Sequence, residues 1–350
     1  MNQLTKILSL DAKKLKYERA LKRGSSTAVL VLFAQGLSGC FRQADEGGSS
    51  ISGVAFDGPL SRAKVFVDAN NNNLLDGSED WAWTNADGTF ALSTNATGPL
   101  VVVGTSETTD ASSGASVDGL VLTAPTGSSV ISPATTVAKK IADDAIDALG
   151  AGATEEQIAE AIDNAYGQAA KAFGLSEAFT GADSTESLST FNPFSGDTTS
   201  EDAVAYAQAA AKIVAVANTI ATAESAAGGA DKGTVILSAL ETIADQALIA
   251  ANEGNELVVD AALVTTVINN ATTQVATNAD LTTALGDAVA TISTAIDTVT
   301  DTTADTAGDI LFASQSILAE TAQSAAKSLA DGAVDISGLT FLKTANISTL

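Results

Sequence analysis

The fold is decided by the stretch Ala63-Lys-Val-Phe-Val-Asp-Ala-Asn-Asn-Asn-Asn-Leu-Leu-Asp-Gly-Ser-Glu79. Apolar and polar residues alternate from Ala63 to Val67, and Trp81 and Trp83 alternate in the same manner after the stretch. Alternation of this kind, with β-branched and aromatic residues, is typical of strands. The sequence therefore predicts two strands joined by a long polar loop.

The polar loop has oxygen-bearing side chains at loop positions 1, 3, 5, 9 and 12, the spacing by which a loop of twelve residues wraps a Ca²⁺ ion. These side chains are Asp68, Asn70, Asn72, Asp76 and Glu79. Position 6 is Asn73 where Gly is usual, and Asn adopts the left-handed conformation more easily than other non-Gly residues. Hard oxygen donors favour Ca²⁺ as the cofactor. The alternative is an Asn-rich turn that needs no metal.

Further short apolar runs surround this loop and are separated by turn residues. They cover 51–56, 63–67, 81–83, 89–92, 100–103 and 120–123. Asp-Gly and Asn-containing turns between short alternating runs indicate antiparallel strands. We expect a small antiparallel β-sandwich over 51–125.

Beyond Pro133 the apolar period becomes helical and alanine dominates. Thr154 and Gln157 fit a capping box, and further helices are expected over about 201–226, 233–252 and 258–277. A seam of apolar residues then requires a partner helix: Leu281, Leu285, Val289, Ile292, Ile296 and Val299. The predicted fold class is multidomain α and β, with an Ala-rich all-α bundle over 126–335 and a C-terminal strand or tail over 336–350.

The N-terminal part has the order of a bacterial lipoprotein signal. Residues 1–39 hold seven basic and two acidic residues, and the apolar run from Thr27 to Ala34 follows the basic stretch. That run is too short to span about 30 Å of hydrocarbon and is typical of a signal-peptide core. Leu37-Ser-Gly-Cys40 resembles a lipobox, so we expect a signal peptide over 1–39, lipid attachment at Cys40 and a flexible tether over 40–50.

The region 51–125, with Ala63 to Glu79 followed by Thr84-Asn-Ala-Asp-Gly-Thr-Phe90, resembles two related families. They are the B-type domains of serine-aspartate-repeat surface proteins and the carboxypeptidase-regulatory-like, prealbumin-type sandwiches. The resemblance implies an extracellular spacer or adhesion domain that Ca²⁺ stabilises. It also implies Asp87 as an additional ligand, although a plain hairpin turn is the simpler interpretation.

Composition excludes several classes of function. The chain of 350 residues has no His, one Cys and a formal charge of −25, from 17 basic and 42 acidic residues. It therefore has no imidazole base and no site for His-ligated zinc. The acidic balance disfavours nucleic acid as a partner.

Two functions compete on these grounds. The first is a non-catalytic, calcium-stabilised lipoprotein of the cell envelope, at the outer membrane or cell surface, used for adhesion or envelope structure. Its partners are the membrane, through the lipid anchor, and a surface protein or a glycan. The second is a hydrolase or solute-binding protein with its site in the helical domain. Trp81 and Trp83 are expected in the core rather than on an exposed platform, because large aromatics contribute most burial in a small domain.

Overall fold

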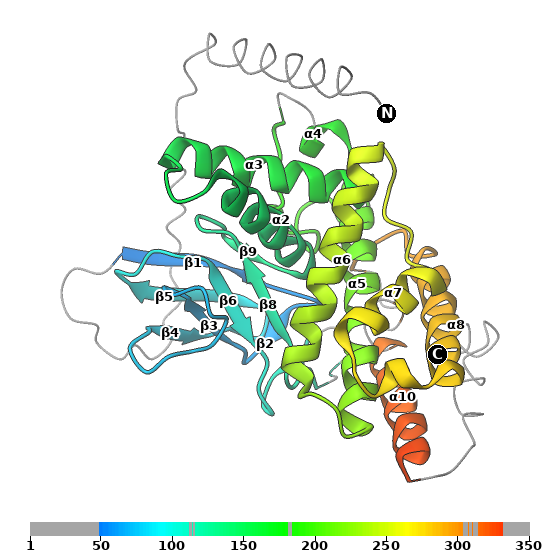
Figure 1. Ribbon diagram of the computed structural model, residues 1–350. Helices are drawn as coiled ribbons and strands as arrows, with labels where there is room; N and C mark the ends of the chain where they lie inside the picture. The colour runs from blue at the N-terminus through cyan, green and yellow to red at the C-terminus, as the bar shows by residue number, and fades with distance from the viewer. Residues whose placement is uncertain are drawn as a thin grey trace. The chain divides into compact units, whose positions relative to one another are not determined.

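The computed structural model describes residues 49–111, 114, 116–180, 184–303, 307, 310 and 314–331, all within the compact unit Asp45–Leu350 (Figure 1). The predicted signal peptide, Cys40, the tether up to residue 48 and the C-terminal tail over 336–350 lie outside the described residues. Residues 49 and 50, predicted as the end of the tether, already belong to the first strand.

The strands form three small sheets in the first part of the described chain. They are β1 (Ser49–Ala55), β2 (Leu60–Ser61), β3 (Lys64–Val67), β4 (Trp81–Trp83), β5 (Thr89–Thr94), β6 (Leu100–Val103), β7 (Thr109–Asp110), β8 (Val121–Ala124) and β9 (Val130–Ile131). The strand orders are β5-β1-β9, β2-β7 and β4-β3-β6-β8. All pairs are antiparallel except β1 with β9, which is parallel. Each of the six predicted strands is present, and the pairing is mainly antiparallel as expected.

The two larger sheets share a core between them. On β3, Val65 and Val67 point into the same apolar cluster as Phe90 and Leu92 of β5. Phe66 points to the opposite face, because side chains alternate along a strand. The sheets therefore have the sandwich-like arrangement that the alternation predicted.

Helices make up most of the chain after Ile131. They are α2 (Pro133–Leu149), α3 (Glu155–Ala172), α4 (Glu177–Thr180), α5 (Glu201–Ala226), α6 (Lys232–Glu253), α7 (Ala261–Ala271), the 3₁₀ helix η1 (Val275–Thr277), α8 (Ala279–Ile296) and α10 (Ser314–Ala330). The capping box of Thr154 and Gln157 forms at the start of α3, and all six residues of the predicted apolar seam are buried. Sheets followed by helices confirm the predicted fold class.

One predicted helix is divided in two. The sequence indicated a single helix over about 258–277, whereas α7 ends at Ala271 and η1 begins at Val275. The backbone N–H groups of Thr273, Gln274 and Val275 bond to the carboxylate of Glu224 in α5. These donors are therefore not available to a continuous helix.

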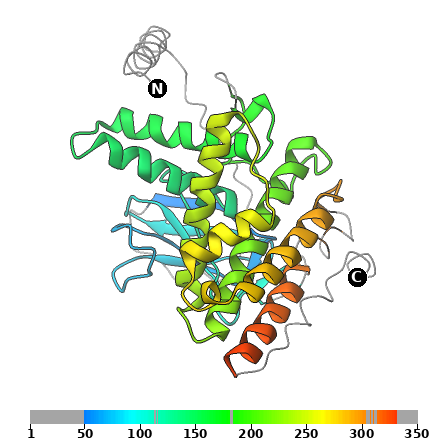
Figure 2. The ribbon, with the colours of Figure 1, turned by 45° about the vertical axis from the view of Figure 1, so that its right-hand side comes forward.

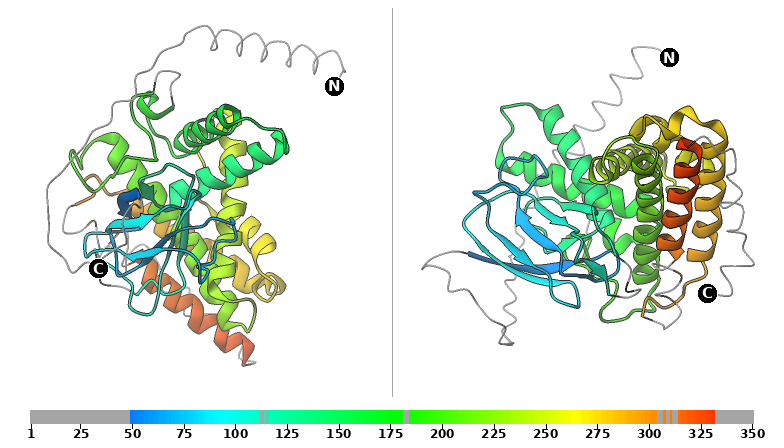
Figure 3. Two further views of the ribbon diagram at one scale, coloured as in Figure 1. Left: turned by 90° about the vertical axis from the view of Figure 1, so that its left-hand side faces the viewer. Right: turned by 90° about the horizontal axis from the view of Figure 1, so that it is seen from below.

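The β part and the helices pack on one continuous apolar cluster. Thr135 and Thr136, in the first turn of α2, donate their hydroxyls to the carbonyl of Thr123 on β8. In Figure 3 (right), α5 and α6 lie between the sheets and the pair α8 and α10, and Figure 2 shows α10 beside α8. The predicted boundary between a β domain and a helical domain at 125/126 stays a prediction.

Helices α5 and α6 are long and apolar enough to cross a membrane by length and composition. Of the relevant apolar windows, 67% of the α5 residues and 50% of the α6 residues are buried inside the protein. A helix that is mostly buried in a protein core passes the same test of length and composition.

Candidate functional site

The loop 68–79 leaves β3 at a buried carboxylate. Asp68 is almost fully buried, and its two carboxylate oxygens accept hydrogen bonds from the backbone N–H groups of Asn72 (3.1 Å) and Asn73 (2.7 Å). Buried carboxylates are stable where donors satisfy them. Asp68 therefore turns the chain back on itself at the first position of the loop.

Three further candidate ligands are brought together on one side of the loop. The side-chain amides of Asn70 and Asn72 donate to Asp76 Oδ2, at 2.7 and 3.1 Å. Their Oδ1 atoms accept backbone N–H groups two residues ahead, from Asn72 (3.2 Å) and Leu74 (2.8 Å). For these Asn residues to act as ligands, their oxygens would have to face the ion in place of the amide nitrogens.

Glu79 closes the loop. Its Oε1 accepts the N–H of Ala69 and its Oε2 accepts the N–H of Asp76, both at 3.0 Å. Asp68, Asp76 and Glu79 are thus held by separate donors, and within the described part of the chain no three His, Cys, Asp or Glu side chains gather as around a metal ion. The calcium site stays a prediction.

Two asparagines of the loop adopt the left-handed conformation, Asn71 at φ 57° and Asn73 at φ 59°. Asn tolerates this region better than other non-Gly residues, which is why the Asn at loop position 6 can replace Gly. Asn71 Oδ1 accepts a hydrogen bond of 2.8 Å from Nζ of Lys139, a buried lysine on α2. The loop is therefore attached to the first helix as well as to the sheet.

Asp87 belongs to the hairpin turn between β4 and β5. Its Oδ1 accepts hydrogen bonds from the N–H (3.1 Å) and the hydroxyl (2.7 Å) of Thr89. The hydroxyl bond is the main cause of the lowered pKa of Asp87. These contacts are those of a plain turn, the simpler of the two interpretations.

The expectation that Trp81 and Trp83 pack in the core is wrong. Their exposed fractions are 43% and 42%, and their rings meet edge to face with centroids 5.2 Å apart. Both project from the same face of β4, an edge strand of its sheet. The sheet face that they share also holds the small buried cluster of Phe66, Val101 and Val121, and Phe66 is the cross-strand partner of Trp81.

A pair of buried acids lies in the β part and was not predicted. Asp57 is 4% exposed, and its Oδ1 has no hydrogen-bond partner. Burial, followed by the nearby charge of Asp110, raises the pKa of Asp57 well above its usual value. Gly58 lies so close to Asp110 that a β-carbon there would overlap the carboxylate. In the sequence, Asp57-Gly-Pro59 has the pattern of a turn, and nothing in this pattern indicates that the side chain of Asp57 is buried.

A further buried acid, Glu224, lies in α5 and has full hydrogen bonding. It accepts from the hydroxyl and N–H of Thr273 and from the N–H groups of Gln274 and Val275, at 2.8 to 3.0 Å. Burial alone would raise its pKa, but these bonds together outweigh burial and lower it. Glu224 therefore anchors η1 rather than serving as a free acid.

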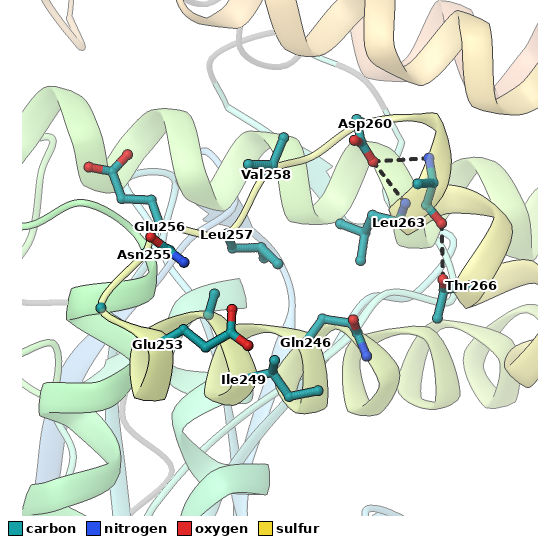
Figure 4. Close-up of a pocket in the computed structure, with 13 residues that line it drawn as sticks. Gln246, Ile249, Glu253, Asn255, Glu256, Leu257, Val258, Asp260, Leu263 and Thr266 are labelled. Atoms are coloured by element: carbon teal, nitrogen blue, oxygen red, sulfur yellow. Dashed lines mark hydrogen bonds between the residues drawn. The ribbon is translucent and has the colours of Figure 1, made fainter.

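A groove lies between the end of α6 and α7 (Figure 4). It has a volume of about 730 Å³ and is lined in part by the exposed side chains of Ile249 and Val258. Asp260, at its rim, uses its carboxylate to cap α7 through the N–H groups of Ala262 and Leu263. Two further acids, Glu253 and Glu256, line the same groove.

Comparisons of the chain with protein-family models, with curated proteins and with solved structures found no match.

Proposed function

We propose that the chain is a non-catalytic, calcium-stabilised lipoprotein of the cell surface that serves adhesion or envelope structure. The observation that carries the proposal is the loop 68–79. Its five oxygen-bearing side chains have the spacing of a calcium loop, and three of them, Asn70, Asn72 and Glu79, are hydrogen-bonded to a fourth, Asp76. Three acids within twelve residues repel one another, and a divalent cation would turn that repulsion into attraction.

The envelope location rests on the N-terminal sequence. A basic stretch, a short apolar run and Leu37-Ser-Gly-Cys40 occur in the order of a lipoprotein signal. We expect mass spectrometry of membrane-extracted protein to find an acylated Cys40 as the first residue. Recovery of a mature chain that keeps Met1 would contradict the anchor.

Calcium is tested on the mature chain by thermal unfolding with excess Ca²⁺ and with chelator. At a concentration of about 100 times the dissociation constant, a ligand of the folded state adds about 2.7 kcal/mol. For a protein of this size that corresponds to a rise of roughly 4 °C in Tm. Glu79→Gln, which keeps the size of the closing residue and removes its charge, should lose most of this rise.

Asp80→Asn is the matched control, because Asp80 is an exposed acid directly outside the twelve-residue loop. It should keep the full response to Ca²⁺. Equal Tm values for the unsubstituted chain with Ca²⁺ and with chelator would remove the calcium part of the proposal.

A solute-binding or hydrolytic role in the helical part is the second candidate, and the groove between α6 and α7 favours it. Its rim carries Glu253 and Glu256 next to exposed apolar side chains, a combination that suits an organic solute. Hydrolysis of a glycan that is lost in both Glu253→Gln and Glu256→Gln would favour this candidate over the first.

A further inference from the structure

We propose that Trp81, Trp83, Lys64 and Arg62 form a binding site for a carboxylated polysaccharide at the edge of the four-stranded sheet. This inference rests on the proposed role in adhesion and names the chemistry of the partner. It concerns side chains outside the calcium loop, so the two proposals can fail separately.

The aromatic part of the site is the exposed tryptophan pair. An indole left more than two-fifths exposed keeps a large apolar surface in water, although aromatic rings usually contribute their surface to burial. The C–H groups on one face of a pyranose ring pack well on such a surface, and the hydroxyl groups at its rim stay solvated. The rings of Trp81 and Trp83 stand at 87° to each other, so they offer a corner rather than a flat platform.

Lys64 supplies a positive charge next to both tryptophan rings. The Nζ atom of Lys64 lies 4.6 Å from the ring centroid of Trp81 and 5.4 Å from that of Trp83. Lys64 pairs with Trp83 across the strands, which brings the ammonium to the same face. Among the described residues no carboxylate forms an ion pair with Lys64, so the two rings hold its charge.

A second cation lies two residues earlier on the chain. Arg62 forms an ion pair with Glu107, and both side chains are more than half exposed, so a competing carboxylate can replace Glu107 at little cost. Arg62 and Lys64 are the only basic residues between positions 49 and 131. The backbone N–H of Arg62 donates to the carbonyl of Thr84, the residue after Trp83, so the chain at Arg62 passes next to the tryptophan pair. These two local cations favour a carboxylated sugar over a neutral one, although the chain as a whole is acidic.

Trp81 and Trp83 are the only tryptophans of the chain, so fluorescence excited selectively at tryptophan, and not at the three tyrosines, reports on this site alone. The mature chain, with Ca²⁺ held constant, is titrated with tetragalacturonate and separately with cellotetraose. We expect a saturable change in fluorescence with the charged oligosaccharide and at least about tenfold weaker binding of the neutral one. Rising salt should weaken the charged complex.

Variants then separate the two parts of the site by calorimetry. Trp83→Ala and Lys64→Met should each weaken binding by about tenfold, a loss typical of one good aromatic or charged contact. Leu149→Ala is the control, because Leu149 is equally exposed, at 42%, but lies at the end of α2. It should bind as the unsubstituted chain does.

Equal binding of the two oligosaccharides, or no effect of Lys64→Met, would overturn the inference, and so would a fluorescence signal that does not respond to tetragalacturonate. If any of these occurs while Ca²⁺ still raises Tm, the calcium proposal stands and only the partner is wrong. A carboxylate-specific response without any effect of Ca²⁺ on Tm would contradict the calcium proposal alone.

Discussion

A buried carboxylate in the helical part and one in the β part have pKa values that are shifted in opposite directions. Glu224 in α5 is fully buried and accepts hydrogen bonds from three consecutive residues, and its pKa is lowered. Asp57 in the β part is buried to nearly the same extent, has an oxygen without a partner, and its pKa is raised. Both side chains are buried, but Glu224 has several donors, whereas Asp57 has an oxygen without a partner and lies near the charge of Asp110. Donors and neighbouring charge together decide whether the charged form is stable inside the protein.

The largest effect is expected when the donors of Glu224 lose their acceptor. Glu224→Ala leaves the N–H groups of Thr273, Gln274 and Val275 unpaired in a buried place. Each buried donor that is left without an acceptor costs about 1–3 kcal/mol, so the summed loss should be at least about 3 kcal/mol. Denaturant unfolding measures the loss, and Glu253→Ala, at the exposed end of α6, serves as control with a change within about 0.5 kcal/mol. A similar small loss for both variants would show that η1 is held by other contacts.

Glu224 and Asp57 change the stability of the protein with pH in opposite directions. The contribution of Glu224 is fully present above its unfolded pKa of about 4.3 and is lost as the pH falls through the lowered folded pKa. The pKa of Asp57 is raised in the folded state, so Asp57 lowers stability as the pH rises from its unfolded pKa of about 3.9 toward the raised folded pKa.

Asp57→Asn should therefore match the unsubstituted chain near pH 4 and exceed it in stability at pH 8. Urea unfolding at both values tests this, and Asp80→Asn, an exposed acid, should show no such difference. An advantage of Asp57→Asn that is the same at both pH values would mean that Asp57 is not protonated in the folded protein.

Lys139 is a buried cation that joins the loop 68–79 to α2. Lys139 bonds to Asn71 Oδ1 at 2.8 Å and to Asp143 Oδ2 at 2.6 Å, with 7% of its side chain exposed. Lys139→Met should destabilise the protein by about 1.5–3 kcal/mol, the range for hydrogen bonds to charged groups. Lys140→Met, which breaks the more exposed pair with Asp144, should cost less than about 1 kcal/mol. A larger loss for Lys140→Met than for Lys139→Met would contradict the role of Lys139 in joining the loop to α2.

Local patterns predicted the elements well. Short alternating runs bounded by Asp-Gly and Asn-containing turns gave strands β3 and β4 to within one residue, and the capping box at Thr154 located the start of α3. Each of these signals depends on residues that are neighbours in the chain. The left-handed Asn73 was predicted for the same reason.

What could not be predicted depends on distant residues. The exposure of the tryptophan pair depends on what packs on that face of the sheet, and the residues that pack on the cluster of Phe66, Val101 and Val121 include Leu75 and Leu237, which come from other parts of the chain. Glu224 looks like one more acid in an Ala-rich helix, since its partners are about 50 positions further on. Asp57 and Asp110 are separated by a similar length of chain, and β2 and β7 bring them together.

The central place of β1 has a mechanical consequence. This strand is the first described element, and it is paired along six residues with β5 and, near its end, with β9. A pull at Ser49 along the strand axis would load these hydrogen bonds together in shear instead of opening them one by one. Directly after β9 comes α2, whose first turn is bonded to β8. A load applied at Ser49 would therefore pass into the packed core of the protein.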